Sequence, residues 1–185
     1  MSLGLDGPLV LVGAGNMGGA LVKGLIERGL PPAEILIQDP APPPGTAVYL
    51  ATVGLQAVAS VSPARAPAGV IVLAVKPQIM DVVAAGVASL AGPDTLVVSI
   101  AAGRTIASIA RHFPPGTAIV RTIPNTPAAI GRGITVAVGN AAVRAPQRAL
   151  ASRLLEAVGD VGWVEDEALI DAATAVSGSG PAYVF

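Results

Sequence analysis

The sequence contains no cysteine and only one histidine, His112, and these two scarcities exclude several kinds of chemistry. Without cysteine the chain can form no disulfide, no thiol nucleophile and no thiolate metal site. A single histidine argues against a histidine-built metal centre, and we do not expect it to serve a Ser-His-Asp hydrolase. The sequence therefore predicts no metal site.

Charged residues and long apolar runs are also scarce. Only 12% of the residues are charged, the net charge is −1, and the lysines and arginines are scattered rather than gathered into a basic patch. No apolar stretch reaches about 18 residues without proline, glycine or charge, as a spanning helix would require. The first residues, MSLGLDG, lack the pattern of a signal peptide. We expect a cytoplasmic protein with no nucleic-acid or membrane partner.

Hydrophobic residues are abundant, at 52% of the chain, and they occur as short β-branched runs that alternate with helical patterns. This alternation predicts parallel strands joined by crossover helices that cover both faces of the sheet. We expect an α/β fold, a Rossmann-type doubly wound parallel sheet over residues 1–165. Residues 168–176 are predicted to form a helix that does not belong to this doubly wound domain. The predicted strands are 8–13, 34–39, 55–59, 69–75, 95–101, 118–123, 133–139 and 161–165, and the main helices are 17–28, 46–53, 79–90 and 146–158.

A glycine pattern, G-x-G-x-x-G, lies between the first predicted strand and the first predicted helix. In that context Gly13 allows a tight turn, Gly15 lets a diphosphate approach the backbone, and Gly18 lets the helix pack close to the strand. The free N–H groups and the helix dipole then favour the anion. The alternative is a glycine-rich turn that binds no ligand. The motif comprises Gly13, Ala14, Gly15, Asn16, Met17 and Gly18.

Asp39 ends the second predicted strand, 21 residues after Gly18. A carboxylate at this place accepts the ribose hydroxyls of an adenosine and repels a 2′-phosphate, and the prolines that follow supply no cation. The residue therefore favours NADH over NADPH. A plain turn aspartate before proline is the alternative.

Three further stretches follow strand ends, where ligands of open α/β sheets gather. Lys76 could contact a cofactor phosphate or a substrate carboxylate, could act as an acid, or could simply be solvated. A nicotinamide that lies across a strand end needs small residues there, and Ile100, Ala101, Ala102 and Gly103 meet this need, although small residues also permit tight turns. Asn125 lies between two prolines and either binds a carboxamide or carboxylate or bonds its own backbone.

Read together, these motifs resemble the pyrroline-5-carboxylate reductase family. The resemblance is collinear over nearly the whole chain, through GAGNMGGAL, LAVKPQ, VVSIAAG, VRTIPNTPAAIGRGIT and LIDAATAVSGSGPAYVF. The first segment is shared with many dinucleotide enzymes, whereas the last two are specific.

The resemblance implies an NAD(P)H-dependent oxidoreductase that reduces the ring imine of 1-pyrroline-5-carboxylate to L-proline, the last step of proline biosynthesis. It implies a nucleotide-binding domain over residues 1–165 and, over 166–185, the beginning of a helical domain for dimerisation and substrate binding. Most of that helical domain is expected to be missing here, together with its homo-oligomer contacts. Asn125 and Glu167 are implied on the substrate side, and no catalytic acid or base is assigned. The implied cofactor-binding residues are Val12, Gly13, Ala14, Gly15, Asn16, Met17, Ala74, Val75, Lys76, Pro77, Ile100, Ala101 and Ala102, to which the pattern of charge adds Asp39.

Two other functions compete with this one. Another reductase on the same template, such as a deazaflavin-dependent NADP reductase or a β-hydroxyacid dehydrogenase, would share the glycine motif but not the NTP turn followed by SGSGPAY. A nucleotide-binding module without turnover is the second alternative. The apolar side of helix 168–176 is expected to be exposed or covered by a neighbouring molecule, because its partners would lie in the missing helices.

Overall fold

The apolar runs form the centre of one sheet in the computed structural model, which describes residues 4–175. The first strand, Leu9–Val12, is buried along its whole length. Leu9 and Leu11 pack into the core on one face of the sheet, and Val10 and Val12 pack into the core on the other. A strand that is apolar on both sides needs helices on both faces, which is the arrangement that the sequence predicts.

The sheet has eight strands in the order β3-β2-β1-β4-β5-β6-β7-β8. The strands are β1 (Leu9–Val12), β2 (Ile35–Gln38), β3 (Ala57–Val58), β4 (Ala68–Leu73), β5 (Ala91–Ser99), β6 (Ala118–Pro124), β7 (Gly133–Gly139) and β8 (Gly159–Trp163). The α-helices are α1 (Asn16–Glu27), α2 (Pro44–Thr52), α3 (Met80–Val87), α4 (Ile106–Ala110), α5 (Ala145–Leu155) and α6 (Ala168–Ala173). The 3-10 helices are η1 (Pro32–Glu34), η2 (Pro63–Arg65), η3 (Pro77–Ile79), η4 (Ala88–Leu90), η5 (Thr126–Ile130) and η6 (Glu156–Val158).

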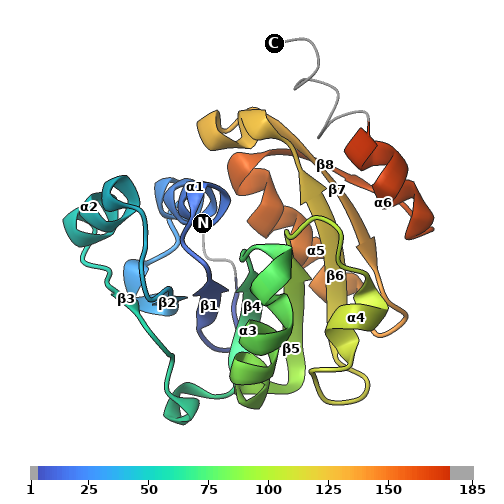
Figure 1. Ribbon diagram of the computed structural model, residues 1–185, viewed down its shortest axis with the longest axis horizontal. Coiled ribbons are helices and arrows are strands. Elements are labelled where there is room, and N and C mark those ends of the chain that lie inside the picture. The colour runs from blue at the N-terminus through green and yellow to red at the C-terminus, as the bar shows by residue number, and fades with distance from the viewer. Residues whose placement is uncertain (1–3, 176–185) are drawn as a thin grey trace.

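The helices form two layers around this sheet (Figure 1). Side chains of α1, α2 and α5 fill the core on one face, and side chains of α3 and α4 fill the core on the other. The strand order reverses between β1 and β4, which pair in parallel from Leu9↔Val70 to Val12↔Leu73. A ligand of an open α/β sheet binds beyond the carboxyl ends of the strands at such a reversal. In this chain that place holds the glycine motif and the segment that follows β4.

The prediction of an entirely parallel sheet is wrong at one strand pair, because β6 and β7 are antiparallel. Only residues 125–132 join the two strands, and a parallel crossover needs about a dozen residues or more. The connection contains η5, which is followed by Gly131 at a φ of 70°. A sequence run shows that a strand is present but carries no information about its direction. The other six strand pairs of the sheet are parallel.

The expectation that the last helix exposes its apolar side is also wrong in part. Ile170 of α6 is 1% exposed and packs against Ile123 and Val138, whereas its neighbour Leu169 is 49% exposed. The segment SGSGPAYVF, residues 177–185, lies outside the described residues. Within residues 4–175, no helix is long and apolar enough to cross a membrane, and no cluster of acidic or histidine side chains is arranged to hold a metal ion.

Candidate functional site

The three glycines of the motif differ in what a side chain at each position would contact. Gly13 has a φ of 95°, and a Cβ there would lie 2.6 Å from the carbonyl oxygen of Ala74. A Cβ on Gly18 would lie 2.1 Å from the carbonyl oxygen of Gly13, so the helix could not approach the strand. A Cβ on Gly15 would meet nothing within 4 Å. The predicted roles of Gly13 in a tight turn and of Gly18 in close packing of the helix are therefore confirmed, and Gly15 faces open space.

The first turn of α1 carries N–H groups without an internal acceptor. Its N-cap is Gly15, which makes no side-chain cap hydrogen bond, and the first turn contains no acidic residue. The first N–H groups of any helix have no partner within the helix, and they lie at the positive end of its dipole. This 12-residue helix thus presents unpaired donors and a partial positive charge beside the open position at Gly15.

Asp39 lies directly beside this turn. Its Oδ2 accepts a hydrogen bond from Ala14 N at 2.7 Å, and its Oδ1 accepts one from Ala41 N at 2.9 Å. The second bond is that of a turn aspartate, and the first ties the end of β2 to the glycine motif. A carboxylate has about four acceptor positions, so two bonds leave capacity for further donors. Asp39 is therefore both a turn residue and a negative charge held at a fixed place next to the motif.

The segment after β4 completes this edge of the switch point. Ala74 N donates to Val12 O at 2.8 Å, and the carbonyl of Ala74 contacts the position of Gly13. Lys76 is exposed, and its side chain has no hydrogen-bonded or ion-paired partner among residues 4–175. Val75 and Pro77 are partly buried on either side of it. The sheet thus brings Val12, the glycine motif and residues 74–77 together, as the sequence predicts for adjacent strand ends.

Residues 100–102 follow the next strand of the sheet. Ile100 N donates to Leu73 O at 3.0 Å, which holds the start of this segment against the end of β4. Ile100 and Ala101 are buried, whereas Ala102 is exposed. Further along, Arg104 forms an ion pair with Asp81 at the start of α3. The segment is therefore fixed to the sheet at one end and to α3 beyond the other.

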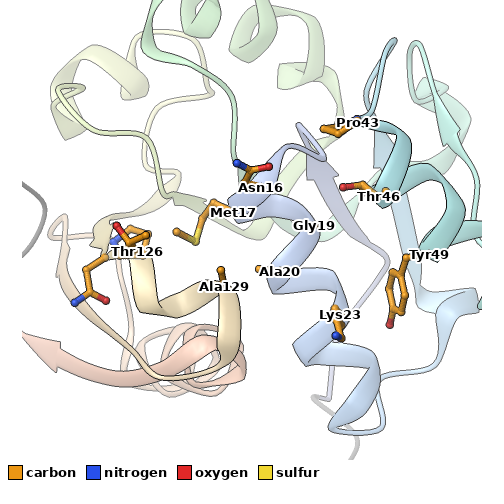
Figure 2. Close-up of a pocket in the computed structure, with 13 residues that line it drawn as sticks. Asn16, Met17, Gly19, Ala20, Lys23, Pro43, Thr46, Tyr49, Thr126 and Ala129 are labelled. Atoms are coloured by element: carbon orange, nitrogen blue, oxygen red, sulfur yellow. The ribbon is translucent and has the colours of Figure 1, made fainter. Parts of the chain in front are cut away.

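A groove of about 780 Å³ runs along the outer side of α1 and joins the glycine motif to the NTP turn. Figure 2 shows α1 between α2, which carries Thr46 and Tyr49, and the segment that carries Thr126 and Ala129. Asn16, Met17 and Asn125 all line it. The small residues Gly19 and Ala20 form part of its floor, and a Cβ on Gly19 would lie 3.0 Å from Thr46 Oγ1.

Asn125 uses its side-chain oxygen within the chain. Its Oδ1 accepts a hydrogen bond from Ile134 N at 2.8 Å, which closes the connection between β6 and β7. The side-chain oxygen thus braces the turn, while the residue still lines the groove. The role of Asn125 toward a substrate stays a prediction.

Glu167 lies elsewhere, and the groove is not lined by it. Its Oε1 accepts hydrogen bonds from Ile106 N at 2.7 Å and from Arg121 Nη1 at 3.0 Å. Arg121 is only 4% exposed at its side chain and also donates to Asp171 at 2.8 Å. Arg121 therefore braces the structure, and the implied substrate role of Glu167 stays a prediction.

Sequence reasoning missed the polar side chains of the outer groove wall. Lys23, Thr46 and Tyr49 line it, and burial together with the negative charge of Glu27 raises the pKa of Tyr49 above its usual value. Lys23 lies 3.9 Å from Glu27. Lys23 and Glu27 are spaced i, i+4 on α1, a pattern that is typical of a solvated helix face, so no local signal distinguishes them.

Asp81 collects three basic side chains on one oxygen. Arg104, Arg111 and His112 all bond to its Oδ1, the last two at 3.2 and 2.8 Å. Because an ionised carboxylate only accepts, His112 Nε2 is the donor. The hydrogen bond from His112 lowers the pKa of Asp81 most, and burial opposes it. The hydrogen bond and charge of Arg104 and the charge of Arg111 lower the pKa further.

We expect Asp81→Asn to lower the thermal unfolding temperature at pH 7, and the difference from the unmutated chain to shrink in acid. A carboxyl whose pKa is lower in the folded state stabilises the fold above its unfolded pKa, and that stabilisation is lost as the pH falls through the folded pKa. The ordinary pKa of an aspartate side chain is 3.8, so the loss is expected below about pH 4. Calorimetry of both chains between pH 7 and 3 measures this, and a difference that stays constant with pH would contradict it.

Comparison with known proteins agrees with the geometry of the glycine motif. Residues 8–103, just over half of the chain, match the family described as NADP oxidoreductase, coenzyme F420-dependent. The chain belongs to this family. The match covers β1 through the segment after β5, which is the part that holds the switch point.

The resemblance to the pyrroline-5-carboxylate reductases is confirmed as well. The chain is 44% identical over 177 residues to the pyrroline-5-carboxylate reductase of Pseudomonas aeruginosa, covering 96% of this chain and 64% of the relative. It is 37% identical over 175 residues to that of Escherichia coli, covering 94% of this chain and 64% of the relative. The chain thus spans just under two thirds of the length of these relatives.

Solved structures show the same fold. A pyrroline-5-carboxylate reductase from Coxiella burnetii superimposes with a TM-score of 0.87 at 34% identity, covering 97% of this chain and 66% of the other. A pyrroline carboxylate reductase from Plasmodium falciparum with NADP bound superimposes with a TM-score of 0.79 at 26% identity, covering 97% of this chain and 65% of the other. Both support a Rossmann-type fold for the described part of the chain.

Proposed function

We propose that the whole protein is a pyrroline-5-carboxylate reductase, an NAD(P)H-dependent oxidoreductase that acts on a C=N bond and gives L-proline. In this proposal a hydride from the nicotinamide goes to the imine carbon, and one proton goes to the ring nitrogen. The relatives at 37–44% identity support the proposal, because their similarity extends over at least 94% of this chain. The observation that carries it is the glycine turn, whose open position and uncapped helix lie beside Asp39.

The residues present fit a dinucleotide. The diphosphate would lie against Gly15 and the first N–H groups of α1, where a Cβ has free space and no side chain caps the helix. Asp39 would accept the ribose hydroxyls. Residues 74–77 and 100–102 would border the rest of the cofactor, and Asn125 would face the substrate from the NTP turn. When bound, the reduced nicotinamide supplies the hydride.

The chain's own contribution is mainly positioning. A protonated cyclic imine is already electrophilic, so the protein must hold it against the nicotinamide in the right geometry. The fixed attachment of Ile100 to Leu73 and of Asn125 to Ile134 provides rigid borders for such an arrangement. We assign no catalytic acid or base to these residues.

We also propose that NADH is preferred over NADPH. Asp39 is held by Ala14 N and Ala41 N, so its negative charge cannot turn away from a 2′-phosphate without breaking two hydrogen bonds. Residues 40–44 offer no positive charge in compensation. The helical domain from residue 166 onward, and a homo-oligomer formed through it, belong to the same proposal for the whole protein.

The test is the oxidation of NADH and of NADPH by this chain and by a chain of the relatives' full length, each with and without pyrroline-5-carboxylate. We expect imine-dependent oxidation by the longer chain, faster with NADH. We expect Asp39→Asn to reduce the ratio of NADH to NADPH efficiency by about tenfold, since about 1.4 kcal/mol of discrimination corresponds to that factor. The carboxamide keeps the shape of the side chain and removes its charge, and it can accept only one of the two backbone hydrogen bonds of Asp39.

Three results would contradict parts of this proposal. Binding of NADH without any imine-dependent oxidation by the longer chain would favour a nucleotide-binding module without turnover. Oxidation that responds to another electrophile and not to the imine would favour another reductase on the same template. A preference of the unmutated chain for NADPH would overturn the role of Asp39 while leaving the reaction in place.

A further inference from the structure

One carboxylate oxygen, Glu167 Oε1, joins three segments that are far apart in the sequence. It accepts from Ile106 N, 61 residues away, and from Arg121, 46 residues away. Ile106 is the first residue of α4, Arg121 lies in β6, and Glu167 is the N-cap residue of α6. The three segments therefore meet at a single acceptor.

The bond to Ile106 satisfies a helix terminus. The first N–H groups of α4 have no partner within the helix, and Thr105 Oγ1 supplies one acceptor by bonding to Ser108 N at 3.1 Å. Glu167 supplies a second acceptor from outside, and its charge is favourable at the positive end of a helix. A charge-assisted bond of this kind is stronger than one between neutral groups. The start of α4 is thus held by a residue that belongs to α6.

The start of α4 is also the end of the segment that we place beside the cofactor. Residues 100–105 run from the bond between Ile100 N and Leu73 O to the bond between Ile106 N and Glu167. Between these two points Ala101 is buried in the core and donates from its N to Ser99 Oγ at 3.4 Å, and Arg104 forms an ion pair with Asp81. Loss of the Glu167 bond would therefore remove one of the two anchors at the end of this segment that lies away from the sheet, the other being the ion pair of Arg104.

The pairing with Arg121 fixes Glu167 in turn. The guanidinium is 4% exposed at its side chain, and a buried cation needs an anion close to it. Asp171, the second partner, is 76% exposed and touches only the other guanidinium nitrogen, Nη2. Glu167 is the better shielded of the two carboxylates, and it alone of the pair contacts α4.

We propose that Glu167 is a positioning residue for the cofactor-facing segment 100–105, and that it couples this segment to α6, rather than binding the substrate. Docking of α6 then helps to shape the cofactor site, and by linkage cofactor binding stabilises the docked α6. The effect on cofactor affinity rests on the proposed function. The attachment of α4 to α6 does not.

The experiment compares the exchange of the Ile106 amide hydrogen and the dissociation constant for NADH in the unmutated chain and four variants. Glu167→Ala removes the acceptor, and Glu167→Gln keeps an oxygen but removes the charge. Asp171→Asn removes the other partner of Arg121 and spares Ile106. Glu165→Gln is the matched control, because Glu165 is 86% exposed and bonds only to Arg148 among residues 4–175.

We expect Ile106 exchange to be at least tenfold faster in Glu167→Ala and at least twofold faster in Glu167→Gln, with the amides of Val97 and Val98 in β5 unchanged. We expect the dissociation constant for NADH to rise about threefold or more in Glu167→Ala. Glu165→Gln and Asp171→Asn are expected to leave both quantities within twofold. NADH should also slow Ile106 exchange in the unmutated chain and have a smaller effect in Glu167→Ala.

Unchanged Ile106 exchange in the Glu167 variants would overturn the proposal. If Glu167→Ala does not fold, the exchange of Ile106 in Glu167→Gln alone decides this test. Faster exchange with an unchanged NADH affinity would also overturn it, because the bond would then only stabilise the fold. A higher KM for the imine, with NADH affinity and exchange unchanged, would make Glu167 a substrate ligand. Failure of the unmutated chain to bind NADH would instead contradict the proposed function.

Discussion

Gly18→Ala is expected to lower the free energy of unfolding by about 3 kcal/mol or more, one of the two largest effects that we expect from a single methyl group in this chain. The added Cβ would lie 2.1 Å from the carbonyl oxygen of Gly13 and 3.3 Å from the Cβ of Ala74. The nearest atom belongs to the backbone, so no side-chain rotation can relieve the overlap. The start of α1 would have to move away from β1, and it would take the buried side chains of Leu21, Val22 and Leu25 with it.

Gly86→Ala is the matched control for this substitution. Gly86 also lies within a helix, α3, and a Cβ there would meet nothing within 4 Å. An alanine in a helix is favoured over glycine by about 0.5–1 kcal/mol, so this variant is expected to be as stable as the unmutated chain or more stable. Urea denaturation of the three chains measures the difference. A Gly18→Ala chain as stable as the Gly86→Ala chain would show that α1 does not pack against β1 as described.

The sequence allowed the centre of the fold to be predicted because burial on both faces leaves a strong local signal. Residues 9–12 and 68–73 are continuous apolar runs, and each lies in a strand that is almost wholly buried. The turn between β1 and α1 was predictable for a related reason, since its glycines are spaced by the geometry of one strand, one turn and one helix. The roles of Gly13 and Gly18 depend on atoms within this unit or the adjacent strand end.

Contacts between distant segments left no such signal. The antiparallel direction of β7 depends on the short connection after Asn125, and the predicted strand runs do not encode direction. The bond between Glu167 and Ile106 joins residues that are 61 positions apart, and no periodicity relates them. The groove wall of Lys23, Thr46 and Tyr49 forms only when α2 packs beside α1. Each of these features depends on tertiary packing, which a single sequence does not display locally.

Gly15→Ala is expected to weaken NADH binding at least tenfold while leaving the fold intact. Gly15 adopts an extended conformation with φ −65° and ψ −167°, which an alanine can also adopt, and its Cβ would meet no protein atom within 4 Å. Because alanine is a poorer N-cap than glycine, the free energy of unfolding should fall by no more than about 1 kcal/mol. The methyl group would instead occupy the space through which a diphosphate reaches the first N–H groups of α1.

Calorimetric titration of NADH into the unmutated, Gly15→Ala and Gly86→Ala chains tests this prediction. Gly86 lies in α3, away from the proposed cofactor site, so its variant should bind as the unmutated chain does.

A tenfold loss of affinity corresponds to about 1.4 kcal/mol. This is less than the removal of all the diphosphate contacts would cost, because the ligand can shift by a fraction of an ångström. Gly15→Val, with a larger side chain in the same space, should therefore weaken binding further. If both Gly15 variants bind NADH with unchanged affinity, the diphosphate does not lie at the N-terminus of α1, because any ligand close enough to accept from those N–H groups must also contact a side chain at residue 15.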